Sequence, residues 1–152
     1  MQMPVGKKDK MFMKKLKTSK GIFELLRKLN FFHDAFIKSV KIESADSFSR
    51  LKGEMVKEVT GSMSLLLHIK HYNYAQKTAL AVSDILLHFN NVKILKFQAG
   101  TLEYPSGFDI VSAKIEPIGS MLKMVFEGNS RGTAKKNCDL LEIVFSDLRL
   151  LN

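Results

Sequence analysis

Cysteine is almost absent from this chain of 152 residues, which contains only Cys138. A single cysteine excludes any disulfide within the chain, which fits a reducing compartment. Long apolar runs are also missing, since no stretch reaches the roughly 18 residues that a membrane-spanning helix needs. The basic amino-terminal stretch is followed by no apolar segment and no small-residue cleavage site, so we expect no secretory signal. These absences predict a cytoplasmic protein.

Sequence motifs of catalysis and cofactor binding are missing as well. The chain has no glycine-rich phosphate loop, no G-x-S-x-G and no carboxylates paired at a fixed helical spacing. His68 and His71 are three residues apart and would point to opposite faces of a strand, while His33 and His88 are distant, so the spacing of zinc ligands is not met. We interpret Cys138 as a small packed residue. The sequence therefore predicts no catalytic residue, no cofactor and no metal site, and favours a protein that is not an enzyme.

The dipeptide His33-Asp34 places a base beside a carboxylic acid, which is one arrangement of an acid–base pair. Adjacent residues rarely face each other, so we favour a structural role in which Asp34 caps a turn and His33 packs where helix gives way to strand. An enzyme whose site combines these two residues with the polar loop at 128–137 is our third-ranked hypothesis.

Positive charge is concentrated at the amino terminus. The formal net charge is +9, from 24 lysines and arginines against 15 aspartates and glutamates. Residues 1–28 hold nine of these cations and two acids, whereas the rest of the chain holds 15 cations and 13 acids. Such a segment could bind nucleic acid, an anionic membrane surface or an acidic protein, or could be a solubilising tail. The nine cations that could contact a polyanion are Lys7, Lys8, Lys10, Lys14, Lys15, Lys17, Lys20, Arg27 and Lys28.

One or two helices are predicted before the strands begin. Residues 11–17 have a composition that could form two helical turns, and Thr18 and Ser19 are residue types that start helices. We divide the chain into a basic tail at 1–19, flexible or partly helical, and a single mainly-β domain at 20–152. Residues 20–30 are predicted to form an amphipathic helix because their apolar residues recur at helical spacing, namely Ile22, Leu25, Leu26 and Leu29.

Runs of alternating apolar and polar residues predict about six strands after the helix. Their connections are short and contain no convincing crossover helix, which favours antiparallel pairing. The predicted fold class is α+β, mainly antiparallel β: a curved sheet, a sandwich or a partial barrel, with the N-terminal helix covering one apolar face. The predicted strands lie at 35–44, 62–72, 80–98, 108–115, 122–127 and 138–151.

The first two predicted strands carry assignments of faces. In 35–44 we expect Phe36, Val40 and Ile42 to point inward, with Lys38 as an exception that suggests an exposed edge. In 62–72 the alternation is clearer, and the residues expected to point inward are Met63, Leu65, Leu67 and Ile69.

Residues 45–60 fit two interpretations. A short helix could begin at Asp46 or Ser47, although Gly53 would cost it about 1 kcal/mol. A strand through 54–60 is the alternative. We favour the helix, because apolar residues recur at roughly helical spacing, at Phe48, Leu51, Met55, Val56 and Val59.

Two segments share a pattern of phenylalanine, two small polar residues, a branched aliphatic, a cation and two aliphatics. They are residues 89–95 and 145–151. The first aliphatic follows the phenylalanine by three positions, so strict alternation cannot bury both residues. A bulge or a tight turn would restore the phase. The repeat therefore predicts breaks in strand pairing at residues 90–91 and 146–147, with Phe89 and Phe145 in the core.

The stretch Phe32-His33-Asp34-Ala35 resembles the opening of a loose group of small bacterial β proteins, whose first strand begins with a turn of hydrophobic, His, Asp and small residue. The resemblance would cover residues 32–151. It implies a domain without assigned activity, and some members of the group look like immunity proteins of bacterial toxin systems. The basic N-terminal helix and the insertion at 45–60 depart from the group's pattern.

Three hypotheses follow for function. The first is a non-enzymatic bacterial domain that binds a protein partner, in an accessory or immunity-like role. The second is a nucleic-acid or anionic-surface binder that acts through the basic N-terminal segment. The third is the enzyme with its site at His33 and Asp34. A toxin gene beside this gene would support the first.

Overall fold

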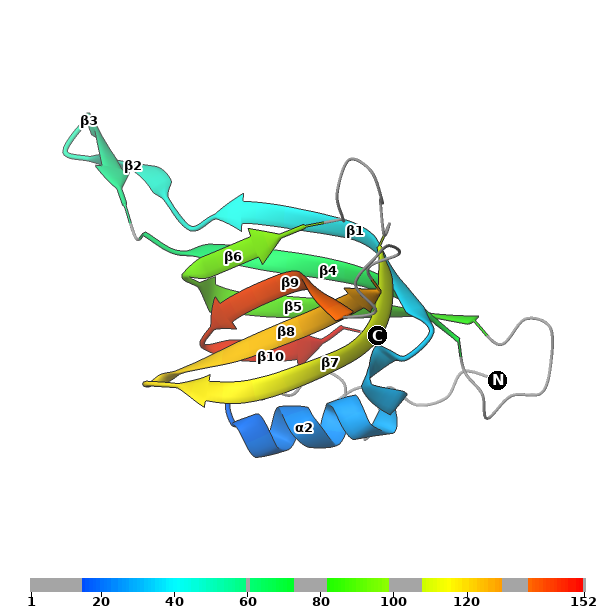
Figure 1. Ribbon diagram of the computed structural model, residues 1–152. Helices are drawn as coiled ribbons and strands as arrows, with labels where there is room; N and C mark the ends of the chain where they lie inside the picture. Colours follow the sequence, from blue (N-terminus) through cyan, green and yellow to red (C-terminus); the bar gives the residue numbers. More distant parts are fainter. Residues whose placement is uncertain (1–14, 60, 73–81, 99–107, 130–136, 152) are drawn as a thin grey trace, which may run out of the picture.

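The computed structural model describes residues 15–59, 61–72, 82–98, 108–129 and 137–151 (Figure 1). In this part of the chain one α-helix, one short 3-10 helix and ten strands follow one another. They are α2 (Ser19–Lys28), η1 (Asn30–Phe32), β1 (Ala35–Ser44), β2 (Ser47–Leu51), β3 (Glu54–Glu58), β4 (Met63–Tyr72), β5 (Val82–Val92), β6 (Ile94–Phe97), β7 (Asp109–Ile118), β8 (Met121–Asn129), β9 (Asn137–Phe145) and β10 (Asp147–Leu150).

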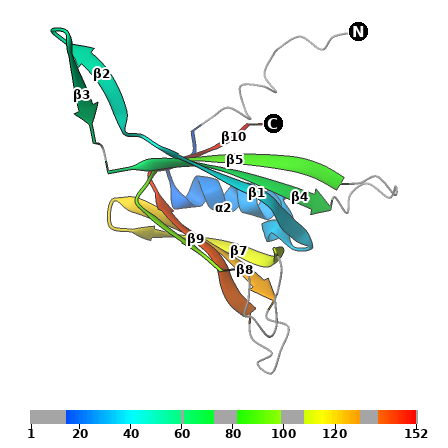
Figure 2. The same ribbon diagram turned by 90° about the horizontal axis from the view of Figure 1, so that it is seen from above.

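Eight of the strands form one antiparallel sheet in the order β10-β5-β4-β1-β7-β8-β9-β6, while β2 and β3 pair with each other. The sheet is curved and is not closed. Seen from above, β1, β4 and β5 form one layer and β7, β8 and β9 the other, and α2 runs along one side between them (Figure 2). The predicted mainly antiparallel fold with a helix against the sheet is confirmed.

Helix α2 contributes to the core because one of its faces is apolar. Ile22 and Leu26 are fully buried and belong to the same cluster as the inward side chains of the strands. Thr18 caps the helix, since its hydroxyl oxygen accepts a hydrogen bond of 3.1 Å from a backbone N–H of the first turn. The predicted amphipathic helix is confirmed, and it ends at Lys28. No helix in the described ranges is long and apolar enough to cross a membrane.

The segment before α2 is extended rather than helical. Leu16 forms an isolated bridge to Leu148 of β10, with backbone hydrogen bonds of 2.8 and 3.0 Å. The predicted helix at 11–17 is therefore wrong at Leu16. A two-turn helix is marginal in water, whereas pairing with a strand satisfies the same backbone groups. Residues 11–14 of that prediction lie outside the described residues.

The ten strands exceed the predicted number of about six. The predicted strand at 80–98 is observed as β5 and β6, separated at Lys93, and the one at 138–151 as β9 and β10, separated at Ser146. The β2–β3 hairpin adds two more strands. The other four predicted strands correspond to β1, β4, β7 and β8. Alternation therefore predicts where strands lie, but it does not predict that a bend divides one predicted strand into two.

The first break occurs where the repeated pattern predicts a bend. Asn91 has a φ of 52°, and the register between β4 and β5 shifts after Phe89, so that Leu65 pairs with Phe89 but Met63 pairs with Val92. This bulge supplies the extra residue that restores the phase. Phe89 and Val92 are consequently both fully buried, although they are three positions apart.

The second break, at Ser146, lies directly beside the first. The amide of Asn90 donates to a carboxylate oxygen of Asp147 at 2.8 Å, and the amide of Asn91 donates to the hydroxyl of Ser146 at 2.7 Å. Phe89 and Phe145, the two phenylalanines predicted in the core, are both fully buried. Their rings pack edge to face, with the ring centroids 4.9 Å apart. The burial of both rings is confirmed. The predicted breaks in pairing are confirmed at Asn91 and Ser146, whereas Asn90 and Asp147 pair with each other.

A bulge in β1 reverses part of its predicted orientation. The register with β4 shifts between Ile37 and Ser39. Ile37 is buried, whereas Phe36 and Ile42 are exposed. The prediction that Phe36 points inward is wrong, because one extra residue, Lys38, places it on the opposite face from Val40. Ile42 pairs with buried Leu65 and so shares the inward face as predicted, but it is 52% exposed. In β4 the predicted alternation has no such interruption and is confirmed.

Candidate functional site

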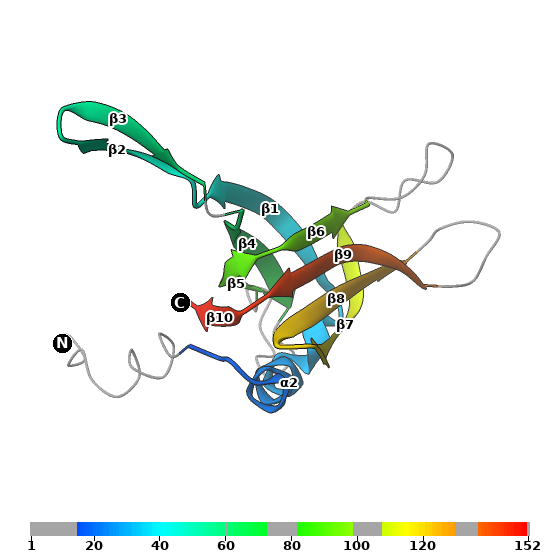
Figure 3. The same cartoon turned by 90° about the vertical axis from the view of Figure 1, so that its left-hand side faces the viewer.

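The β2–β3 hairpin stands away from the sheet in all three ribbon views (Figures 1 and 3). Its strands span Ser47–Leu51 and Glu54–Glu58, so in the described part of the segment 45–60 the favoured short helix is wrong and the alternative of a strand through 54–60 is closer. Lys52 and Gly53 have φ values of 51° and 80°. Positive φ at both central residues gives a two-residue turn whose twist matches that of the paired strands. This turn favours a hairpin over a helix.

The hairpin continues the ladder between β1 and β4. Ser44 pairs with Met63 at the end of that ladder, and the next N–H, of Ala45, donates to the carbonyl oxygen of Ser62 at 3.0 Å. Beyond this bond every residue of β2 and β3 is exposed. The sheet therefore fixes the base of the hairpin, and both of its faces contact solvent.

Alternation gives the hairpin two faces of opposite charge. Phe48 pairs with Lys57, and Arg50 pairs with Met55; we call these four residues the front face. Phe48 is 68% exposed and Met55 is 60% exposed. The back face consists of Ser47, Ser49, Leu51, Glu54, Val56 and Glu58. The front face thus combines two cations with two large apolar side chains in solvent, and the back face carries two carboxylates.

Charges on the hairpin have no ion-pair partner among the described residues. Within the ranges that the structure describes, no ion pair joins Arg50, Glu54, Lys57 or Glu58 to another residue. All four are exposed. Charges in this state are available to a partner of complementary charge.

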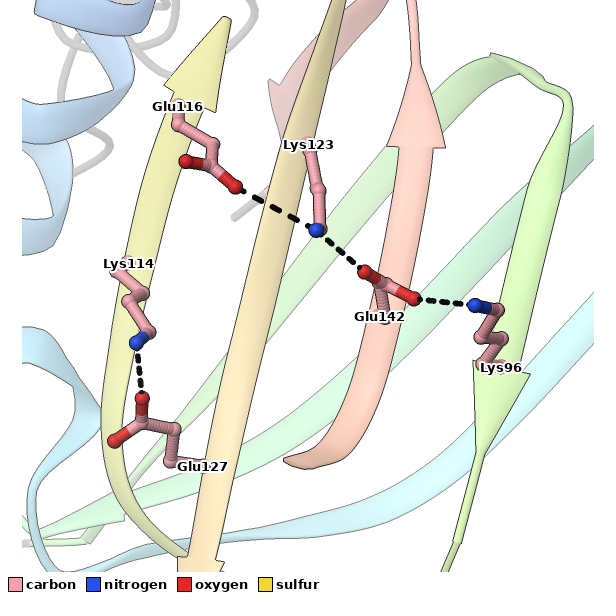
Figure 4. Close-up of polar contacts among 6 residues, drawn as sticks. All are labelled: Lys96, Lys114, Glu116, Lys123, Glu127 and Glu142. Carbon is pink, nitrogen blue, oxygen red and sulfur yellow. Dashed lines mark ion pairs between the residues drawn. The ribbon is translucent and has the colours of Figure 1, made fainter. Parts of the chain in front are cut away.

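The outer face of β7, β8, β9 and β6 is different, because its charges are paired (Figure 4). Glu142 lies between Lys96 and Lys123, with N–O distances of 3.4 and 2.8 Å, and Lys123 also lies 3.5 Å from Glu116. The hydrogen bond between Lys123 and Glu142 lowers the pKa of Glu142 and raises the pKa of Lys123. This face therefore satisfies its own charges.

A second polar cluster lies on the outer face of β4 and β5. One carboxylate oxygen of Asp84 is 2.6 Å from Lys70 Nζ and 2.7 Å from His68 Nε2. The pKa of Asp84 is lowered mainly by the hydrogen bond from Lys70 and next by the hydrogen bond from His68. Ser39 lies opposite His68 in the strand register, but within the described residues no hydrogen bond joins the two. We interpret the cluster as cross-strand pairing, because Lys70 lies opposite Asp84 in the register of β4 and β5.

His33 and Asp34 lie where η1 gives way to β1, and both side chains are more than half exposed. Their closest N–O distance is 3.8 Å, whereas His33 Nδ1 lies 3.0 Å from the carbonyl oxygen of Val111. The prediction that His33 packs at the junction is wrong, because a hydrogen bond holds its ring at the surface. Asp34 has a φ of 61°, which fits its predicted place in a turn. Residues 130–136 of the loop in the enzyme hypothesis lie outside the described residues.

The predicted polyanion contacts are only partly described. Five of the nine cations are described, and all of them are exposed: Lys15, Lys17, Lys20, Arg27 and Lys28. Arg27 lies 2.7 Å from Glu24, and this hydrogen bond lowers the pKa of Glu24. The others, Lys7, Lys8, Lys10 and Lys14, lie outside the described residues. The structure thus brings three of these cations onto α2 with one carboxylate among them.

The described residues contain no group of three or more side chains that could hold a metal ion. His68 and His71 lie on opposite faces of β4, as predicted: His68 is partly exposed, whereas His71 is buried with its ring edge-on to Phe32. Burial lowers the pKa of His71, which favours a neutral ring at pH 7. The Cys138 side chain lies outside what the structure describes.

None of the front-face residues is predicted from the sequence to bind anything. A signal was present in Lys52-Gly53, because glycine at the second position of a two-residue link between strand-like runs is typical of a hairpin turn. The apolar residues of the hairpin lie on both faces, so alternation shows no inward side. The same residues also fit helical spacing, which masks the strand pattern.

Comparisons with known proteins leave the family open. A scan against protein-family models and searches of curated proteins and of solved structures find no match to this chain. The resemblance of residues 32–151 to small bacterial β proteins stays a prediction.

Proposed function

We propose that this chain is a non-enzymatic domain that binds another protein through the β2–β3 hairpin. The observation that carries the proposal is the exposure of large apolar side chains on and beside a hairpin that stands away from the sheet: Phe48, Leu51, Met55, Val56 and Val59. An immunity-like role, in which the partner is a toxin protein, is one form of this function.

These side chains are exposed to solvent rather than buried against the sheet. A two-stranded hairpin is at best marginally stable by itself, and polar residues at the same positions would favour solubility. Full burial of Phe48 or Met55 in a complex would contribute about 1.5–3 kcal/mol each. Phenylalanine, methionine and arginine, all present on the front face, are enriched where proteins contact one another. These properties support a docking role.

Site-specific photo-cross-linking tests the proposal. A photoreactive amino acid replaces Phe48 in the full-length protein, in the cells that produce it, and replaces Glu116 on the ion-paired face as a matched control. We expect a protein that cross-links at position 48 and not at position 116. That protein is then purified, and its dissociation constant is measured by calorimetry. The double variant Phe48→Ala/Met55→Ala should bind at least about tenfold more weakly.

Thermal melting of the double variant must match the wild type, so that weaker binding does not reflect unfolding. Docking through the hairpin would be ruled out if no protein cross-links at position 48, or if the same proteins cross-link at positions 48 and 116. An unchanged dissociation constant for the purified partner would have the same meaning.

A second candidate function is binding of nucleic acid or an anionic surface through the basic N-terminal segment. The exposure of all five described cations of that segment favours it. A fluorescent oligonucleotide is titrated with the protein at low and high salt, and with a variant in which Lys7, Lys8, Lys10 and Lys14 are changed to glutamine. Binding that weakens with salt and is lost in the variant supports this function. Absence of salt-sensitive binding at low ionic strength excludes it.

A further inference from the structure

The chemistry of the front face selects a class of partner. We propose that it docks on an acidic protein surface, on which carboxylates surround an apolar pocket. This inference rests on the proposed function and adds to it the kind of surface that Phe48, Arg50, Met55 and Lys57 recognise.

The positions of the two cations support this partner. Lys57 lies directly opposite Phe48, and Arg50 follows Phe48 by two residues on the same face. Side chains opposed across an antiparallel pair are about 5 Å apart, and those two positions along a strand are about 7 Å apart. A pocket that takes up Phe48 and Met55 would therefore also cover both cations. A covered cation without a partner is strongly unfavourable, so the surface must supply carboxylates beside its pocket.

A second copy of this chain fits the front face poorly. Carboxylates of the sheet such as Glu142, Glu127 and Asp84 already contact lysines. The back face of the hairpin offers Glu54 and Glu58, but packing front on back is a head-to-tail contact, which cannot form a two-fold dimer and leads to rings or open chains of molecules. Packing front on front would bring cations against cations. A different protein is therefore the better occupant.

A nucleic acid also fits less well than a protein. The hairpin from residue 47 to 58 carries three cations and two carboxylates. Affinity for nucleic acid rises with the number of phosphates that cations neutralise, and this ribbon is nearly neutral. Phe48 is the only aromatic residue of the hairpin, whereas successive bases stack on successive rings.

Selection of peptides tests the class of partner directly. A random peptide library is selected on the full-length protein and counter-selected on the Phe48→Ala/Met55→Ala variant. We expect the surviving peptides to be enriched in aspartate and glutamate around an apolar anchor. Their affinity is then measured for Arg50→Gln/Lys57→Gln and for Lys20→Gln/Lys28→Gln, which removes the same charge from α2. The first pair should weaken binding about tenfold and the second by less than about twofold.

Surviving peptides that are neutral or basic would overturn the acidic class but leave the hairpin as a docking site. Equal weakening by both glutamine pairs would overturn the assignment to the front face. If no peptide survives, the inference falls, and if position 48 also gives no cross-link, the proposed function falls with it. Binding of oligothymidylate, or dimerisation in sedimentation, that is lost in Phe48→Ala would name a nucleic acid or a second copy as the occupant and contradict the inference.

Discussion

The β2–β3 hairpin and the outer face of β7, β8, β9 and β6 contain similar residues but differ in how their charges are used. Both place lysines and glutamates on antiparallel strands. On the four-stranded face Glu142 has a lysine on each side, whereas no described residue forms an ion pair with Glu54 or Glu58. The number of neighbours explains the difference, because an inner strand has cross-strand partners on two sides and a strand of a hairpin on one.

Apolar residues on the two surfaces follow the same division. Val125 and Val144 alternate with charged residues on the outer face of β8 and β9, yet each is only 6% exposed. Long lysine and glutamate side chains beside them can cover apolar surface with their aliphatic parts. Phe48 on the hairpin is mostly exposed, although Lys57 lies opposite it. The outer face of the four strands therefore pairs its own charges and covers its apolar residues. The hairpin leaves both charges and apolar surface available to a partner.

The largest expected effect comes from making the same substitution in both regions. Phe89→Ala removes a fully buried ring that packs on Phe145 and should lower the free energy of unfolding by about 3–5 kcal/mol. Phe48→Ala removes an exposed ring and should change it by less than about 0.5 kcal/mol. Urea denaturation measures both values. A large loss for Phe48→Ala would show that the hairpin is part of the core structure.

A smaller effect is expected when the pH is lowered. The pKa of Glu142 lies below its ordinary value of 4.5, chiefly because of the hydrogen bond from Lys123. As the pH falls, the Glu142 carboxylate is therefore protonated in the unfolded chain before it is protonated in the folded protein. The stability that its ion pairs contribute is fully present above about pH 4.5 and is lost as the pH falls through the lower pKa of the folded state. Urea denaturation at about pH 6 and pH 3 should show a smaller loss of stability for Glu142→Gln than for the wild type.

The matched control is Glu54→Gln on the hairpin. This carboxylate has no ion pair within the described residues, so the variant should lose stability with falling pH as the wild type does. If the profile of Glu142→Gln is parallel to that of the wild type, the two ion pairs of Glu142 drawn in Figure 4 do not stabilise the fold.

The smallest effect should be confined to the hairpin turn. Gly53 has a φ of 80°, so Gly53→Ala should cost about 1 kcal/mol locally. Lys52→Asn should act in the opposite direction, because Asn-Gly is the preferred sequence of this turn. Hydrogen exchange of the amides from 48 to 57 should become faster in the first variant and slower in the second, while Leu87 in β5 is unchanged. A change at Leu87 would show that the hairpin and the sheet unfold together.

Strands of the sheet could be predicted from the sequence because each has an inward face. Leu65, Leu67 and Ile69 reveal β4 by alternation alone. The phase argument for Phe89 and Val92 also located a bend, since burial of both residues requires an extra one between them. In β1 the adjacent residues Phe36 and Ile37 are both apolar, so either could be the inward one in an alternating pattern. Because the bulge at Lys38 leaves no separate signal in the sequence, the orientation of Phe36 could not be predicted.

The candidate site could not be predicted, because it lacks the inward face that makes strands recognisable. Phe48 and Met55 are as apolar as core residues, and only their distance from the sheet shows that they are not buried. The bridge of Leu16 to Leu148 is another case, since it depends on a strand at the other end of the described chain. Local pattern predicts local structure, and neither feature is local.

The junction of the two bent strands also determines when the sheet can form during synthesis. Its side-chain bonds join residues 57 and 55 positions apart, so a long loop must close before they are made. Leu148 pairs with Phe89 on one side and bridges to Leu16 on the other. A nascent chain therefore keeps the edges of β5 and of the segment around Leu16 open until β10 has left the ribosome, and these edges are exposed to wrong pairing during that interval.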